Sequence, residues 1–200
     1  MRPASDDEGQ DHGHALTAKR WNVTSETARR NFAEHVLPHL DDAYSLARWL
    51  CGDATDAEDV VQDACVRALK ALETGVPVER PRAWLLAIVR NAAYSWLGKN
   101  RPRAIVLAGG AEEAEARADA LETGGSPSPE AALIEMADRA MVAGAIDCLP
   151  LTFRETLVMR EINGLSYRDI SEATGAPIGT VMSRLARARA LLAQKLGTAP

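Results

Sequence analysis

The chain has 200 residues, of which 46% are hydrophobic, 26% are charged and 4% are aromatic. This balance is typical of globular protein and argues against wholesale disorder, and the length suffices for one or two compact domains. Apolar runs such as 83–89 are far shorter than the ~20 residues that a membrane span needs. The N-terminus carries acids and no apolar segment of a secretory signal, so we expect a cytoplasmic protein without membrane insertion.

Charge is distributed unevenly along the chain. The net charge of −5 argues against a uniformly basic nucleic-acid-binding protein. However, 41–63 contains seven acidic residues and one basic residue, whereas 80–103 contains six basic residues and no acidic one. A second basic stretch, 184–195, has four basic residues and again no acidic one. The sequence therefore predicts two basic surfaces separated by acidic segments.

The N-terminal part begins with a polar segment followed by a long helix. We expect residues 1–30 to form a flexible extension, with a helical turn near 21–29, because this segment lacks a sustained hydrophobic period. Apolar residues then recur at helical spacing from Phe32 to Leu50. Pro38 is placed to kink the first turns of this helix.

Two further helices are expected before residue 103. Gly52 marks the end of the first helix. Thr55 and Glu58 have the spacing of a capping box, which predicts the start of an amphipathic helix with one apolar face and one acidic face. From Arg82 to Gly98 the apolar residues keep helical spacing, which predicts a third helix with basic residues along it.

The composition changes again after Pro102. The following residues are rich in Ala, Glu and Gly, and such a segment cannot bury enough apolar surface to fold alone. We therefore expect a flexible linker at 104–129 between a domain at 31–103 and a second domain at 130–200. Helical spacing recurs in the second domain, and no segment shows strand periodicity. The predicted fold class is all-α, with two small helical domains joined by a flexible linker.

Residues 165–185 contain the strongest local pattern of the C-terminal domain. Ser166 and Asp169 are expected to form a capping box that opens a short helix. Gly175 is placed to take the left-handed turn after it, and Thr180 to cap the next helix. This succession predicts a helix-turn-helix.

The second helix of this motif has the features of a DNA-reading helix. Its apolar stripe begins at Val181 and repeats at Leu185, which turns Ser183 and Arg187 outward. Such a helix can lie in the major groove with its first residues near base edges and its guanidinium groups near phosphates. The alternative is an ordinary helical corner with a solvated arginine face. The expected DNA-contacting residues are Thr180, Ser183, Arg184, Arg187 and Arg189.

Three motifs carry a family resemblance. They are the acidic run 56–63, the segment 82–91, and 149–157 followed by the helix-turn-helix. With these motifs in this order, the sequence from Phe32 to Leu196 resembles bacterial RNA polymerase sigma factors of the sigma-70 family, extracytoplasmic-function (ECF) group. The resemblance implies a factor that binds core RNA polymerase, directs it to promoters with −10 and −35 elements, and assists promoter melting.

The resemblance also implies which surfaces meet which partners. Residues 31–103 would bind the −10 element and the β′ and β subunits of core polymerase, and residues 130–200 would bind the −35 element. The implied polymerase contacts are Asp56, Asp59, Gln62 and Asp63. The implied −10 contacts are Arg82, Arg90, Asn91, Lys99, Arg101 and Arg103, a sparser basic run than many relatives have. The family also implies an anti-sigma factor as a partner.

Aromatic side chains lie near the implied −10 contacts. Trp84, Tyr94 and Trp96 could stack on melted bases. The helical spacing of the two tryptophans among apolar residues favours core packing instead, and the role of Tyr94 stays open.

Other chemistries find little support. His12 and His14 lie close together, and His35 and His39 share a helix face at i, i+4 spacing, but no Cys or Asp is placed to complete a metal site. The three cysteines are scattered without CxxC spacing, so we expect no metal, no cofactor and reduced thiols. No catalytic motif is present, so the chain is not expected to be an enzyme. Two rival functions remain. A polymerase-independent helix-turn-helix regulator would not co-purify with core polymerase, and metal analysis would identify a metal or redox sensor.

Overall fold

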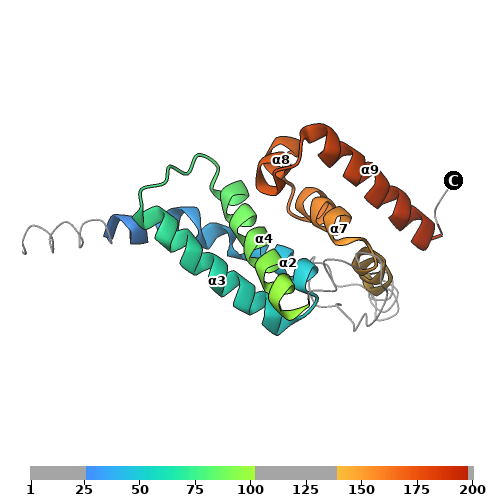
Figure 1. The fold of residues 1–200 in the computed structure, drawn as a ribbon, viewed down its shortest axis with the longest axis horizontal. Coiled ribbons are helices and arrows are strands. Elements are labelled where there is room, and N and C mark those ends of the chain that lie inside the picture. Colours follow the sequence, from blue (N-terminus) through green and yellow to red (C-terminus); the bar gives the residue numbers. More distant parts are fainter. Residues whose placement is uncertain (1–25, 102–138, 198–200) are drawn as a thin grey trace, which may run out of the picture.

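The computed structural model describes residues 26–101 and 139–197, and these residues contain helices and turns but no strand (Figure 1). The N-terminal part consists of a helix at 26–35, a short 3-10 turn η1 (Leu37–His39), α2 (Leu40–Cys51), α3 (Ala54–Glu73) and α4 (Pro81–Asn100). The C-terminal part consists of a helix at 139–147, α7 (Leu151–Leu157), the π turn η3 (Val158–Ile162), α8 (Tyr167–Thr174) and α9 (Ile178–Lys195). The all-α fold class is confirmed for the described residues.

The first predicted helix is divided into two. The helix at 26–35 starts within the expected extension, and Ala28 is buried there, so residues 26–30 are part of the fold. Pro38 lies in η1, which separates that helix from α2. Because proline cannot donate a backbone hydrogen bond, it ends the helical ladder rather than only kinking it. Gly52 ends α2 in the left-handed conformation with φ 91°, as predicted.

The start of α3 differs from the prediction. Its N-cap is Asp53, whose carboxylate accepts hydrogen bonds from the backbone N–H groups of Thr55 at 2.8 Å and Asp56 at 3.2 Å. The expected capping box of Thr55 and Glu58 is therefore wrong. Aspartate is among the best N-cap residues, and Asp53 precedes Thr55, so the helix begins earlier than the pattern suggested.

Helices α2, α3 and α4 pack against one another around an aliphatic core. Leu46, Val60, Leu85, Leu86 and Val89 have at most 2% of their surface exposed. Fully burying a side chain of this kind contributes roughly 1.5–3 kcal/mol. Pro81 occupies the first turn of α4, where its missing N–H would have had no helical partner.

The helix-turn-helix forms largely as the sequence predicted. Ser166 and Asp169 make the reciprocal capping box at the start of α8, and Gly175 follows it with φ 70°. Pro177, not Thr180, is the N-cap of α9. The fixed φ of proline suits the residue that enters a helix, so Thr180 lies inside the first turn, with its N–H bonded to the Pro177 carbonyl at 2.8 Å.

The two parts of the chain touch each other. Helix α4 packs against α8, and α2 packs against α7, while α9 lies on the outer side of α7 and α8 (Figure 1). The expected linker at 104–129 lies outside the described residues. The two helical domains therefore share an interface, which the sequence did not predict.

Candidate nucleic-acid and protein interfaces

Helix α9 presents a polar face opposite its buried stripe. Val181, Leu185 and Ala188 are buried against α7 and α8. Ser183 and Arg187 are exposed, as the helical spacing predicted. A helix in the major groove needs such an open face, since its N-terminal residues must approach the base edges.

The three arginines of α9 differ in their partners. Arg184 is partly buried, with its Nη1 atom 3.7 Å from Glu155 Oε1. Arg189 lies 2.5 Å from Glu161 Oε1, and this hydrogen bond raises the pKa of the guanidinium. Arg187 is exposed and has no ion-pair partner among the described residues. Arg187 is therefore the α9 guanidinium most available to DNA.

Two exposed apolar side chains on α9 escaped the sequence analysis. Ile178 has 47% and Met182 has 52% of its surface exposed. They lie four residues apart, so they share one face in the first turns of the helix. Their position outside the apolar stripe of Val181 and Leu185 is the sequence feature that would have identified them as exposed. Apolar side chains in a recognition helix can contact the methyl group of thymine.

The predicted cationic set on and after α4 does not form one open surface. Arg82 donates two hydrogen bonds of 2.7 Å to Asp42 of α2. Arg101 lies 3.4 Å from Asp56. Asn91 and Lys99 are exposed, and Arg103 lies outside the described residues. Of the described members of the set, Asn91 and Lys99 are the ones open to solvent and free of such ion pairs.

Arg90 of α4 is held by the C-terminal domain. Its Nε and Nη2 atoms donate to the two carboxylate oxygens of Glu155 on α7, at 2.7 and 3.3 Å. The Glu155 side chain is 0% exposed and that of Arg90 is 17% exposed. The guanidinium also lies 4.4 Å from the centre of the Tyr94 ring. Burial, followed by the nearby Glu155 charge, raises the pKa of the Tyr94 hydroxyl.

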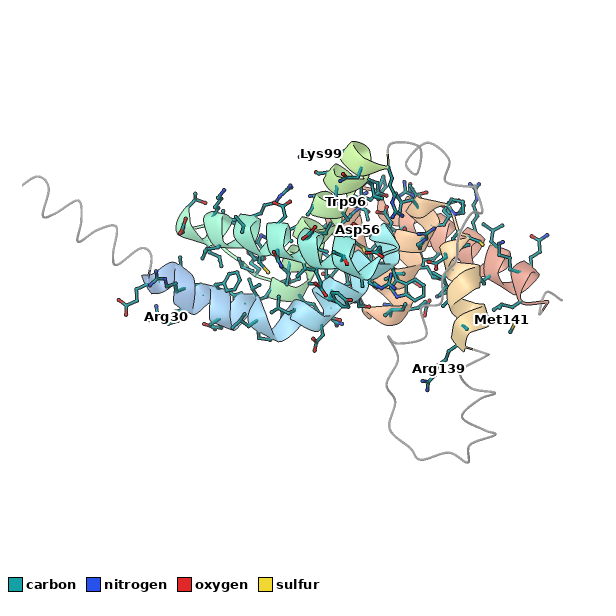
Figure 2. The ribbon with its side chains drawn as sticks, turned by 90° about the horizontal axis from the view of Figure 1, so that it is seen from below. Arg30, Asp56, Trp96, Lys99, Arg139 and Met141 are labelled. Atoms are coloured by element: carbon teal, nitrogen blue, oxygen red, sulfur yellow. The ribbon has the colours of Figure 1, made fainter. Side chains whose placement is uncertain are left out.

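The aromatic residues near α4 are partly buried. Trp84 and Trp96 pack against the hydrophobic core, as their spacing favoured. The Arg101 guanidinium lies 5.7 Å from the centre of the Trp96 ring. Figure 2 shows Asp56, Trp96 and Lys99 at the same end of the N-terminal helices. Tyr94 lies beneath Arg90, which leaves its ring covered in this arrangement.

Arg80 is a further residue that the sequence analysis did not select. It precedes α4 and pairs with both Asp169 and Glu172 of α8. Beside these residues lies a cavity of about 310 Å³, whose apolar lining includes Trp84. The two partners of Arg80 lie 89 and 92 residues away in the sequence, so the local pattern gave no indication of these contacts.

Helix α3 carries the predicted acidic face. Asp59, Gln62 and Asp63 are exposed, whereas Asp56 is partly buried and its pKa is raised, first by that burial. Val66 lies on the same side of the helix and has 51% of its surface exposed. A protein-binding surface has an apolar core inside a polar rim, and Val66 fits the apolar part of such a surface. The sequence analysis missed Val66, although it lies outside the apolar stripe.

The described residues contain no group of three or more His, Cys, Asp and Glu side chains that could hold a metal ion. Cys51, Cys65 and Cys148 form no disulfide, and burial raises the pKa of Cys65. None of the described helices is long and apolar enough to cross a membrane. His12 and His14 lie outside the described residues.

Comparison with known families places both domains. Residues 35–103 match the family Sigma-70 region 2, and residues 139–192 match the family Sigma-70, region 4. The ECF RNA polymerase sigma-E factor of Haemophilus influenzae is 31% identical over 144 residues, which cover 70% of this chain and 75% of that protein. The chain is an ECF sigma factor of the sigma-70 family. It therefore acts in transcription initiation by directing core RNA polymerase to promoters.

Other relatives agree with this assignment. The RNA polymerase sigma-H factor of Pseudomonas aeruginosa is 36% identical over 166 residues, which cover 80% of this sigma factor and 83% of the relative. Among solved structures, the sigma factor RpoE in complex with the anti-sigma factor NepR from Bartonella quintana has a TM-score of 0.64 at 27% identity. That match covers 84% of this sigma factor and 98% of the solved chain. CnrH in complex with the cytosolic domain of CnrY has a TM-score of 0.60 at 26% identity, covering 88% and 94%.

Proposed function

We propose that α9 reads the −35 element of the promoter and that its exposed face makes the contacts. The observation that carries this assignment is the buried stripe of Val181, Leu185 and Ala188, which leaves Ser183 and Arg187 facing solvent within a helix-turn-helix. Ile178 and Met182 extend this face. Thr180, Arg184 and Arg189 lie beside it and complete the proposed −35 set.

Arg187→Ala tests this proposal. The variant should weaken binding of the polymerase holoenzyme to −35 DNA and lower the salt slope by about one, because one phosphate contact is lost. Lys195→Ala is the matched control, since it removes one exposed cation from the far end of the same helix. Equal DNA affinity of the two folded variants would reject the role of Arg187.

We infer that the acidic face of α3 binds core RNA polymerase. Asp59, Gln62 and Asp63 are exposed there, Asp56 lies at its edge, and the exposed Val66 adds apolar area at the centre of such a patch. An acidic face suits a basic partner surface because opposite charges steer association. Co-purification of this sigma factor with core polymerase, compared with a variant of this face, tests the assignment.

We also propose that α4 and the residues after it bind the −10 element. Asn91 and Lys99 are exposed and supply a polar, cationic surface. Arg82, Arg90 and Arg101 belong to the same set but are paired with carboxylates in this arrangement. Arg103 lies outside the described residues.

The remaining assignments follow from the family. We propose domain limits of 26–103 for region 2, because the helix at 26–35 belongs to the fold, and of 130–200 for region 4, with 1–25 as an extension and 104–129 as a linker. The chain itself is not an enzyme, because RNA synthesis belongs to its polymerase partner, and it acts in the cytoplasm. Both solved relatives described above are in complexes, one of them with an anti-sigma factor, which supports an anti-sigma partner for this chain.

A further inference from the structure

Helix α9 carries two parallel rows of exposed residues. Residues four apart lie on the same side of a helix, and the exposed residues in the first three turns of α9 follow this spacing. The first row, which we call the apolar row, consists of Ile178, Met182 and Ala186. The second row, which we call the polar row, consists of Gly179, Ser183 and Arg187. The outward face of α9 is therefore divided along its length into an apolar half and a polar half.

The first two turns of α9 offer few hydrogen-bonding groups to a partner. Among residues 178–185, Ser183 is the one exposed side chain that carries a polar group. Its hydroxyl donates to the backbone carbonyl of Thr180 at 3.0 Å, so its proton is committed to the helix. Ile178 and Met182 have 47% and 52% of their surface exposed beside it. The N-terminal part of a recognition helix lies nearest the base edges, and in α9 this part is mainly apolar.

The charge of α9 favours DNA as the partner of the apolar row. The helix contains three arginines and one lysine and no acidic residue. Arg187 is exposed in the polar row, directly beside Ala186. In the major groove of DNA, the phosphates at the rim attract cations and the thymine methyl groups at the floor contact apolar side chains. An apolar row bordered by cations matches both features of this groove.

We propose that the apolar row recognises the methyl group at C5 of a pyrimidine, so that α9 binds thymine and 5-methylcytosine alike. The inference rests on the proposed −35 role of α9 and names the chemical group that it reads. Thymine presents O4 as an acceptor and cytosine presents N4 as a donor, and of these two bases thymine carries the C5-methyl group. Methylation of cytosine at C5 adds the same group at the same edge. Ile178 has no hydrogen-bonding group and Met182 has only a weakly accepting sulfur, so the row senses the methyl group and not the donor or acceptor.

The spacing of the apolar row matches the spacing of base pairs. A helix rises 1.5 Å per residue, so Ile178 and Met182 lie about 6 Å apart along α9. Base pairs follow one another at about 3.4 Å, and the two side chains therefore span about two base-pair steps. Ala186 lies about 6 Å further along the helix, but its side chain ends at Cβ. Ile178 and Met182 are thus the members of the row that can reach two nearby methyl groups. Cytosine methylation within the −35 element should consequently strengthen binding of this sigma factor.

A four-base comparison tests the proposal. The polymerase holoenzyme first selects −35 duplexes from a random library, and each thymine of the selected site is then replaced by uracil, cytosine or 5-methylcytosine with the matching base opposite. At positions under the apolar row, thymine and 5-methylcytosine should bind equally, about fourfold tighter than uracil and cytosine, because one buried methyl group is worth about that factor. Recognition through O4 instead places uracil with thymine and both cytosines below them. That order, equal binding of all four bases, or a selected site without thymine overturns the proposal.

Met182→Ala assigns the methyl dependence to α9. In this variant the difference between thymine and uracil should disappear at one position of the site. The matched control is Met141→Ala, which removes a methionine with 55% of its surface exposed from the helix at 139–147 of the same domain (Figure 2) and should keep the difference. Met182→Leu retains an apolar side chain and should keep most of it. These positions are exposed, so melting should stay near that of wild type. A methyl dependence that survives both Met182→Ala and Ile178→Ala overturns the role of the apolar row.

Arg187→Ala separates failure of this inference from failure of the −35 role. If thymine and uracil bind equally while Arg187→Ala still weakens binding, α9 reads the −35 element without the methyl groups, and the methyl inference alone is overturned. If Arg187→Ala also leaves binding unchanged, α9 is not the DNA-reading helix and both proposals fail. Loss of core polymerase pull-down in folded Met182→Ala would show that the apolar row contacts protein, which likewise overturns the inference.

Discussion

Arg90→Ala should destabilise the folded chain far more than removal of an exposed guanidinium. The change removes hydrogen bonds of 2.7 and 3.3 Å to Glu155, whose side chain is 0% exposed. Removing one partner of a buried ion pair typically costs 3–5 kcal/mol. Arg184 remains 3.7 Å from Glu155 and compensates in part, so we expect a loss of about 2–3 kcal/mol. For a chain of this size that corresponds to roughly 4–12 °C in melting temperature.

The matched control is Arg67→Ala. Arg67 pairs with Asp63 at 2.6 Å, but the two side chains are 42% and 49% exposed, and such pairs are worth about 0–1 kcal/mol. Circular dichroism melting compares these two variants. Melting of Glu155→Gln, and of Arg90→Ala combined with Glu155→Gln, then gives the coupling free energy between Arg90 and Glu155. We expect the double variant to lose at least 1 kcal/mol less than the sum of the singles. Additive losses, or equal melting of Arg90→Ala and Arg67→Ala, would refute the reasoning.

Three other predictions concern separate parts of the molecule. Asp59→Arg with Asp63→Arg should prevent pull-down of core polymerase while the melting temperature stays near that of wild type, because both side chains are exposed. Normal pull-down of polymerase by this variant would show that the acidic face of α3 is not the polymerase-binding surface. Replacing one thymine by uracil in a selected −35 duplex should weaken binding by the wild-type protein about fourfold, the effect of losing one buried methyl group. The same replacement should leave binding by Met182→Ala unchanged. Equal loss of affinity in both proteins would exclude a contact between Met182 and the thymine methyl group. The backbone N–H groups of Asp56 and Thr55 lower the pKa of Asp53. The stabilising effect of the Asp53 carboxylate is therefore present above its unfolded pKa of about 4 and is lost as pH falls through the lowered folded pKa. Asp53→Ala should therefore reduce the melting temperature at pH 7 and not near pH 2, and a pH-independent deficit would contradict the capping role.

Local structure in this chain was predictable where a single residue type determines the backbone conformation. Gly52 and Gly175 take the left-handed conformation at helix ends, which glycine adopts without steric cost. The capping box of Ser166 and Asp169 formed as expected. The start of α3 was not predictable to the residue, because Asp53 and Thr55 are both good N-cap residues and the hydrophobic period does not choose between them.

The candidate surfaces were predictable only as helix faces. The 3.6-residue period identifies which side of a helix faces away from its own core, and it correctly turned Ser183 and Arg187 of α9 outward. For α4, the family resemblance and not the period named Arg90 as a −10 contact. The structure instead pairs Arg90 with Glu155, which is 65 residues away in the sequence. Periodicity says nothing about whether solvent or another domain covers the outward face.

Charge segregation explains why α4 pairs with α7 and α8 of the C-terminal domain. A basic stretch that can track DNA phosphates is equally able to pair with carboxylates of its own chain, because guanidinium groups bind both through paired oxygen acceptors. In a chain with a net charge of −5, such carboxylates are abundant, and Glu155 and Glu172 are tethered to α4 by the same chain. Arg80 and Arg90 therefore pair with carboxylates of the C-terminal domain, and the cost of leaving a buried carboxylate unpaired holds Glu155 to α4.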